Sequence, residues 1–110
     1  MAAFVKGDVV IVPFPFSDLS NAKRRPALVI ASLGRQDLIL CMITSQSSND
    51  QYITAISNRD FVSGTLNRDS YVKANRVFTA NERIITYIAG TLVPDKVNEV
   101  ISNLITILRT

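Results

Sequence analysis

The most informative part of the chain is the stretch Lys23-Arg24-Arg25-Pro26-Ala27-Leu28-Val29-Ile30. Three cations precede a proline, and an uncharged apolar run at 27–31 follows it. Such a short run, partly β-branched, is typical of a strand that is buried on both faces. Pro26 lacks an N–H, which suits the first residue of a strand, and it favours extended geometry at Arg25. The stretch therefore predicts a guanidinium group at the entry of a rigid strand, with a solvated charge cluster at a loop end as the plainer alternative.

The composition indicates a single small domain that covers residues 1–110. The chain has 110 residues, of which 47% are hydrophobic and only 19% are charged. That charged fraction is below the usual quarter of a soluble domain, so we expect a partner to cover some apolar surface, most simply in a homodimer. The net charge of +3 allows a polyanionic ligand without requiring one.

Several kinds of chemistry are excluded by the residues that the chain lacks. It contains no histidine and one cysteine, Cys41, which lies in an apolar run and is expected to be a buried free thiol. Ser-His and Cys-His nucleophilic pairs are therefore excluded, and we expect neither a metal nor a cofactor. No apolar run approaches the roughly 18 residues of a membrane span, and the N-terminus is too short and polar for a signal peptide. We therefore expect a cytoplasmic protein without a membrane partner.

The hydrophobic pattern predicts several strands followed by one helix. Turn signals at Arg59-Asp60 and Gly64 punctuate the middle of the chain, and Pro13-Phe14-Pro15-Phe16 is expected to leave the first strand as an edge or loop. Strands are expected at about 8–13, 27–31, 37–44, 51–57, 70–77 and 83–92. After Pro94, apolar residues recur at the spacing of one helical face: Val97, Val100, Ile101, Leu104, Ile107 and Leu108. This order predicts a mainly β fold with α, a small β-barrel on which a C-terminal helix packs.

Five short segments, in this order, resemble one known family. They are Lys6-Gly7-Asp8-Val9-Val10, Arg25-Pro26-Ala27-Leu28-Val29-Ile30, Cys41-Met42-Ile43-Thr44-Ser45-Gln46, Ser63-Gly64-Thr65-Leu66 with Asp69-Ser70, and Ile88-Ala89-Gly90-Thr91-Leu92. Together they span nearly the whole chain, which resembles the MazF/PemK toxins of type II toxin–antitoxin systems. The resemblance implies an SH3-like barrel with a C-terminal helix, a homodimer, and an antitoxin protein that neutralises it. It also implies sequence-selective, metal-independent cleavage of single-stranded RNA (mRNA), in which the 2′-hydroxyl attacks the phosphate and leaves a 2′,3′-cyclic phosphate.

The resemblance places the catalytic positions of the family at Arg25 and Thr44. A planar guanidinium group suits phosphate oxygens, and a hydroxyl at a strand end has a rigid seat, so both residue types fit this chemistry. A strand-end threonine that bonds only backbone is the plainer alternative for Thr44. Further residues are expected to bind RNA through phosphate contacts, stacking or base choice: Lys23, Arg24, Phe14, Phe16, Ser45, Gln46, Lys73, Asn75 and Arg76. Tyr52 is a further candidate for stacking, and one phenylalanine could instead belong to the core.

The chain departs from the family at one segment. Some relatives have Arg-x-Asp where this chain has Lys73-Ala74-Asn75, and some have a histidine in the loop after the first strand. Lysine keeps the charge without the planar fork, and Asn75 has no ionisable proton. Any further acid or base must then be Asp8, Asp18, Asp69 or solvent.

The alternative function is a non-catalytic binder on the same fold, either a gyrase poison or a decayed toxin that binds only its antitoxin. A general SH3-like interaction module is the weaker third interpretation.

Overall fold

The computed structural model describes residues 3–14 and 23–110. The strands are β1 (Asp8–Phe14), β2 (Lys23–Ser32), β3 (Asp37–Thr44), β4 (Ile53–Ile56), β5 (Phe61–Gly64), β6 (Ser70–Asn81) and β7 (Tyr87–Leu92). Short 3-10 helices η2 (Asn58–Asp60) and η3 (Glu82–Ile84) precede β5 and β7, and the helix α1 (Pro94–Leu108) ends the chain.

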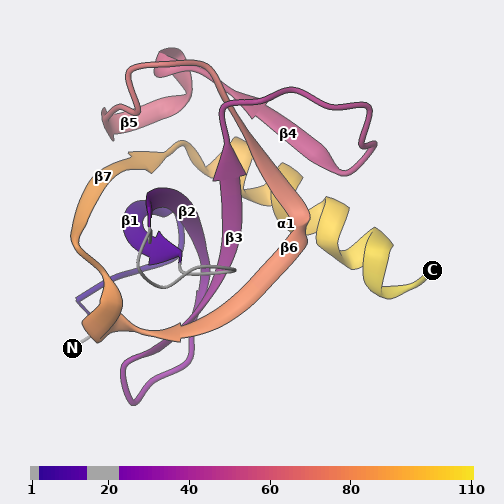
Figure 1. Cartoon of the computed structure of the whole chain (residues 1–110). Coiled ribbons are helices and arrows are strands. Elements are labelled where there is room, and N and C mark those ends of the chain that lie inside the picture. The colour runs from indigo at the N-terminus through magenta and orange to yellow at the C-terminus, as the bar shows by residue number, and fades with distance from the viewer. Residues whose placement is uncertain (1–2, 15–22) are drawn as a thin grey trace.

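The strands form one curled antiparallel sheet in the order β4-β6-β3-β2-β1-β7-β5. Strand β6 leads through η3 into β7, and this arc curves around β1 and β2, which lie in the middle of the sheet order (Figure 1). The fold is therefore the mainly β, barrel-like architecture with a C-terminal helix that the sequence predicts.

Strand β2 is buried on both faces, as predicted. Leu28 and Ile30 belong to a first hydrophobic cluster, which also includes residues of β3 and α1. Ala27 and Val29 belong to a second cluster on the other face, together with Val10, Val12, Leu38 and Leu40. Because successive side chains of a strand point to opposite faces, one four-residue run supplies both cores.

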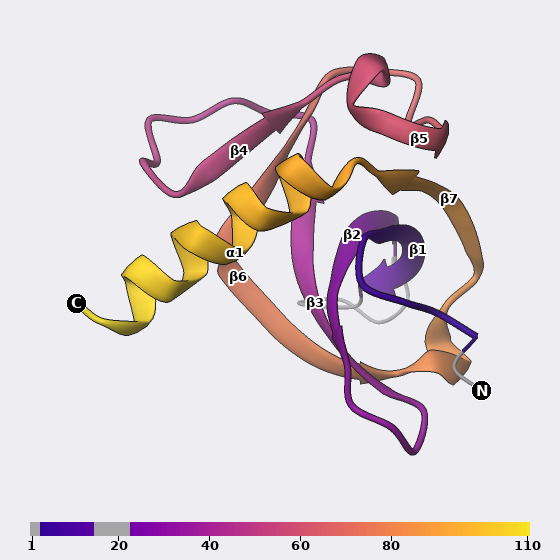
Figure 2. The same ribbon diagram turned by 180° about the vertical axis from the view of Figure 1, so that it is seen from behind.

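The helix α1 covers the first cluster, and its apolar stripe is mostly the predicted one. Val97 and Val100 are buried, and Figure 2 shows α1 lying across β6. Burial of each valine side chain contributes roughly 1.5–3 kcal/mol. Polar bonds fix the helix as well, since Asn103 Nδ2 donates to the buried Thr54 Oγ1 at 3.1 Å. Leu108 ends this stripe at the last turn, where it is 74% exposed and lines a cavity together with Ile101, Leu104 and Ile107.

Both proline-containing segments are more strand-like than the sequence predicts. Strand β1 continues through Pro13 and Phe14, and β2 begins at Lys23 instead of at Pro26. The pairing explains why: β1 has its last β7 partner at Ile11, and β2 has its first β3 partner at Ala27. Beyond those points β1 and β2 form a two-stranded ribbon with free outer sides, where a missing proline N–H costs no ladder bond.

The observed bounds of four other strands differ from the predicted ones, because residues distant in the sequence pair there. Strand β5 was missed because Gly64 suggested a turn, although Phe61 pairs with Leu92 and Gly64 with Gly90. Strand β4 is shorter than the predicted 51–57, β6 continues to Asn81, and β7 begins only after η3. The predicted strand at 37–44 and the helix after Pro94 are confirmed.

Cys41 is a buried free thiol in the first cluster, as expected. Burial raises its pKa from 9.0 to about 11, so the thiol stays protonated at neutral pH. Because the thiolate is the reactive form, Cys41 does not act as a nucleophile in the folded protein.

The close approach of β5 and β7 can be tested at Gly64. A Cβ at this position would clash with Ala89 O and lie 2.6 Å from Gly90 Cα, and the backbone φ is +71°. We expect Gly64→Ala to lower the free energy of unfolding by about 2–5 kcal/mol, the sum of left-handed strain and overpacking. Urea denaturation of purified protein measures this difference.

Gly34→Ala is the matched control. Its φ is +81°, but a Cβ added to Gly34 would have no atom within 4 Å. This variant should lose only the conformational part, about 1–2 kcal/mol. Equal losses in the two variants would contradict the steric explanation.

Candidate nucleic-acid interface

The register of β2 and β3 brings Arg25 and Thr44 to one cavity. Val29 pairs with Leu40 and Ala27 pairs with Met42. Continuing this register by two residues in each strand places Arg25 opposite Thr44, on the face of the second cluster. Both residues line a cavity of about 440 Å³. We call it the arginine cavity; its polar and aromatic lining includes Arg24, Arg25, Thr44, Ser45, Arg68 and Tyr87.

The arginine cavity is strongly cationic. Arg24 and Arg25 come from β2, and Arg68 comes from the loop between β5 and β6. The lining residues that the structure describes include no aspartate or glutamate. A concave surface with charge of a single sign concentrates counter-ions, and guanidinium groups bind phosphate oxygens in a bidentate manner. The arrangement suits a phosphate group.

The hydroxyl of Thr44 accepts a backbone hydrogen bond and keeps its own proton for donation to a ligand. Its Oγ1 accepts a hydrogen bond from the backbone N–H of Gln46 at 3.1 Å, which fixes the hydroxyl at the end of β3. A hydroxyl that accepts one bond can still donate its own proton. The backbone bond expected of a strand-end threonine is therefore present, and it orients the donor that a phosphate would need.

A second cavity, of about 620 Å³, borders Thr44 from the other side. We call it the β6 cavity because most of its lining comes from β6: Lys73, Asn75, Arg76, Val77 and Phe78, with Met42 and Thr44 from β3. The predicted RNA-binding residues thus divide into two groups. Arg24 and Ser45 lie with Arg25, whereas Lys73, Asn75 and Arg76 lie in the β6 cavity, and Thr44 lines both cavities.

Asn75 anchors the loop that follows Thr44. Its Nδ2 donates to Asp50 Oδ2 at 2.7 Å, while Asp50 Oδ1 accepts the Tyr52 backbone N–H at 2.8 Å. The Asp50 N–H in turn donates to Ser48 Oγ at 3.3 Å. The asparagine that departs from the Arg-x-Asp pattern is therefore a neutral donor that holds a carboxylate. It fastens the 45–52 loop to β6.

The remaining predicted residues do not line the two cavities or are not described. Lys23 and Gln46 are exposed and line neither cavity. Phe16 and the side chain of Phe14 lie outside the described residues. Tyr52 packs, partly buried, against the first cluster and lines neither cavity.

Sequence reasoning missed Arg68 and Tyr87 at the arginine cavity. Arg68 lies in a loop without periodicity, so its neighbours are invisible in the sequence. Tyr87 reaches the cavity because β7 pairs with β1, where Ile11 is its partner. The one signal in the sequence for a role of Arg68 was its position, two residues after the family segment Ser63-Gly64-Thr65-Leu66.

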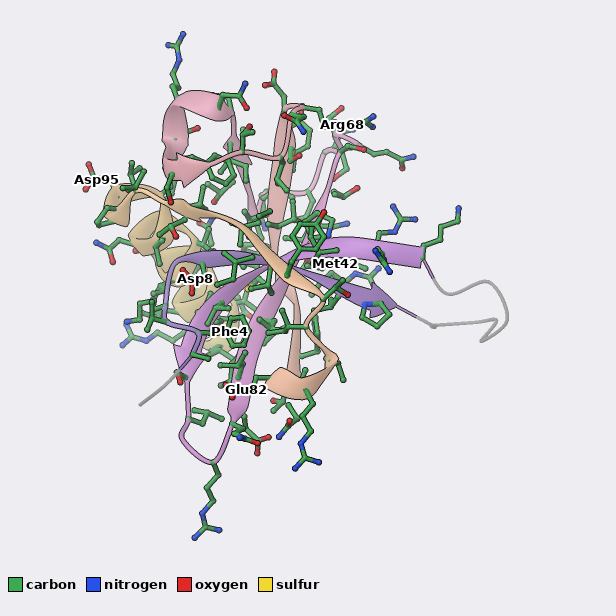
Figure 3. The ribbon with its side chains drawn as sticks, turned by 90° about the vertical axis from the view of Figure 1, so that its left-hand side faces the viewer. Phe4, Asp8, Met42, Arg68, Glu82 and Asp95 are labelled. Carbon is green, nitrogen blue, oxygen red and sulfur yellow. The ribbon has the colours of Figure 1, made fainter. Side chains whose placement is uncertain are left out.

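Of the candidate carboxylates that the structure describes, neither Asp8 nor Asp69 lines the arginine cavity. Asp8 is buried and accepts hydrogen bonds from the Val5 N–H at 3.0 Å and Thr91 Oγ1 at 3.1 Å. Figure 3 shows Asp8 well apart from Arg68, which lies in the upper part of that view. Asp69 lines a different cavity, and Asp18 lies outside the described residues.

In the described part of the chain, no group of three or more His, Cys, Asp or Glu residues could hold a metal ion. Across residues 3–14 and 23–110, no helix has the length and apolarity to cross a membrane.

Comparison with known proteins decides the family. The model for PemK-like, MazF-like toxins of type II toxin–antitoxin systems matches residues 5–108. The chain belongs to this toxin family. No curated protein sequence matches it.

Solved structures share the fold of this MazF-like toxin at low sequence identity. An endoribonuclease from a mycobacterial species, in complex with its cognate antitoxin, superposes with a TM-score of 0.76 at 19% identity, covering 97% of this chain and 96% of that one. A MazE–MazF structure (Form-III) from Deinococcus radiodurans gives 0.77 at 20%, covering 97% of each chain. The Mycobacterium tuberculosis toxin MazF-mt6 gives 0.74 at 13%, covering 93% and 96%.

The Asp50–Asn75 bond can be tested by exchanging its partners. Asn75→Asp places two carboxylates at hydrogen-bond distance, so we expect loss of the bond and about tenfold faster amide exchange in the 45–52 loop. The double variant Asp50→Asn/Asn75→Asp restores a donor and an acceptor, and should restore slow exchange. NMR hydrogen exchange at the Tyr52 amide gives the measurement. The bond is unimportant for the loop if the single variant exchanges as slowly as the wild type.

Proposed function

We propose that this toxin is a sequence-selective endoribonuclease that cleaves single-stranded RNA, mRNA above all, in the cytoplasm. The observation that carries the proposal is the shared seat of Arg25 and Thr44 in a cationic cavity. Family membership supports it, as do the neighbouring folds described as endoribonucleases. In this reaction the 2′-hydroxyl oxygen bonds to the adjacent phosphorus and the bond to the 5′ oxygen breaks. The products are a 2′,3′-cyclic phosphate and a 5′-hydroxyl.

Each of the two side chains has a defined task in this chemistry. Arg25 donates two parallel hydrogen bonds to the non-bridging oxygens and stabilises the charge of the pentacoordinate phosphorane. Thr44 donates its hydroxyl proton to the same phosphate. Because no described lining residue is acidic, water takes the proton of the 2′-hydroxyl and returns one to the leaving 5′ oxygen. Arginine side chains stay protonated in proteins, so the guanidinium group acts as a donor of hydrogen bonds and not as a base.

The surrounding cations hold the rest of the strand. Lys23, Arg24, Lys73 and Arg76 contact phosphates, which sets the salt dependence of binding without choosing a sequence. Ser45 and Gln46, in the loop that Asn75 fastens through Asp50, take part in base choice, and Phe14 and Phe16 stack on bases.

We infer a homodimer and a protein antitoxin as the partners of this toxin. Large apolar side chains outside the two cavities are exposed, among them Val62 and Ile84, and a second copy would cover such surface. A neighbouring fold was solved with its cognate antitoxin. An acidic antitoxin segment would complement the cationic cavities and exclude RNA from them.

The non-catalytic alternative rests on a specific observation. No described carboxylate lines the arginine cavity, and Asn75 already donates to Asp50. A gyrase poison or a protein that binds only its antitoxin would need no proton transfer at this place. Growth arrest with intact RNA would favour the gyrase target, and expression without arrest would favour the decayed toxin.

Substitution of the two central residues tests the endoribonuclease proposal. We expect Arg25→Ala to lower kcat/KM by about 10²–10³ because it removes charge stabilisation in the transition state. Arg25→Lys should recover only part of this loss, since a lysine lacks the planar fork. Thr44→Val should cost about tenfold through the lost hydroxyl donor. The assay maps RNA ends after incubation with purified protein and identifies the terminal phosphate by mass spectrometry.

Arg83→Ala is the matched control, because Arg83 is exposed in η3 and lines neither cavity. It should cleave like the wild type. Absence of specific cleavage by the wild-type protein would remove the endoribonuclease proposal.

A further inference from the structure

We propose that Arg68 and Tyr87 form a nucleotide subsite in the arginine cavity, which binds the phosphate and the unpaired base next to the cleaved bond. The inference rests on the proposed function, because it assumes that Arg25 and Thr44 hold the reacting phosphate. It assigns a role to two residues that neither the family motifs nor the strand pattern indicate.

The sheet places Tyr87 two strands away from Pro26, the neighbour of Arg25. Ile11 pairs with Pro26 on one side and with Tyr87 on the other, so these three residues form a row across β2, β1 and β7. With neighbouring strands about 4.8 Å apart, the Tyr87 backbone lies roughly 10 Å from that of Pro26. Tyr87 and Arg25 thus line the same cavity although they come from strands on either side of β1, and the site is wider than one phosphate.

Tyr87 presents an aromatic ring that the core does not use. The residue is 53% exposed and belongs to neither hydrophobic cluster. Exposed aromatic rings in a cationic groove are the usual platforms for unpaired bases, because every base has a face that can stack. The neighbouring Ile88 is also exposed and adds apolar surface beside the ring.

Arg68 is an exposed residue whose backbone is held in place. Its carbonyl oxygen accepts a hydrogen bond from Oγ of the buried Ser70 at 3.2 Å. The turn before it is closed by the Asn67 N–H, which donates to Thr65 Oγ1 at 3.0 Å. The guanidinium group is thus carried by a loop whose backbone is hydrogen-bonded in place, and Figure 3 shows Arg68 well apart from Asp8.

The charge balance of the cavity calls for more than one anion. Three guanidinium groups line it without any described acidic partner, while the reaction itself places one phosphate between Arg25 and Thr44. A second phosphate of the same strand would satisfy the excess charge, and the ring would hold its base. A single-stranded segment fits because stacking on Tyr87 needs a base that is free of a complementary partner.

A binding experiment tests the subsite separately from cleavage. The probe is a fluorescent single-stranded RNA of about 12 nucleotides with 2′-O-methyl groups throughout, which cannot undergo 2′-hydroxyl attack. Affinity is measured by anisotropy between low and moderate salt for the wild type, Arg68→Ala, Tyr87→Ala and Tyr87→Phe, with Arg83→Ala as the control. Equal free energies of unfolding establish that the variants are folded.

We expect Arg68→Ala to reduce the slope of log affinity against log salt by about 0.7, the value for one phosphate contact on a single strand. Tyr87→Ala should weaken binding by about tenfold or more, and Tyr87→Phe should bind like the wild type because the ring is kept. An unchanged slope for Arg68→Ala, or equal binding by Tyr87→Ala and the wild type, would overturn the subsite. So would variants that weaken binding of an acidic peptide but leave RNA binding intact.

Failure of the two proposals can be told apart. If the wild type cleaves unmodified RNA but Arg68→Ala and Tyr87→Ala bind the probe normally, the subsite is wrong and the endoribonuclease proposal stands. If the wild type binds the probe in the predicted way but does not cleave, the binding surface is supported and the catalytic role is overturned.

Discussion

The structure depends on the burial of β2 on both of its faces. Leu28 and Ile30 enter one core while Ala27 and Val29 enter the other. A slip of one residue would exchange these two sets, and neither core would accept the other set without cavities or clashes. Burial on two sides therefore fixes the register of β2 against β3, and that register brings Arg25 to the cavity of Thr44.

The candidate site lies where β1 and β2 lose their outer partners, β7 and β3, and continue as a two-stranded ribbon. Strand β2 has β3 as a partner only from Ala27 onward, and β1 has β7 only as far as Ile11. The ribbon beyond these points has free sides, where charged side chains remain in water while their backbone stays anchored in the sheet. The rigid core therefore holds the backbone of the charged residues in a fixed position, and the open ribbon lets a long polymer reach their side chains.

Local patterns predicted the parts of the molecule that local contacts determine. The apolar run after Pro26, the strand before Thr44 and the amphipathic helix after Pro94 are all confirmed, because burial alone decides their form. Strand β5 was missed because its side chains are largely exposed and its pairing with β7 joins distant residues. Arg68 and Tyr87 were missed for the same reason: only tertiary pairing brings them to Arg25. The role of Asn75 as a donor to Asp50 likewise joins residues 25 positions apart.

The most direct test of the roles of Arg25 and Thr44 is the structure of the toxin bound to an RNA that carries its mapped cleavage site, with a 2′-deoxy sugar at the attacking position. Removal of the 2′-hydroxyl stops the reaction and leaves the phosphate in place. We expect the phosphate at that position to lie within hydrogen-bond distance of both the Arg25 guanidinium group and the Thr44 hydroxyl. A phosphate held elsewhere, with Arg25 and Thr44 in contact with other parts of the strand or with solvent, would contradict these roles.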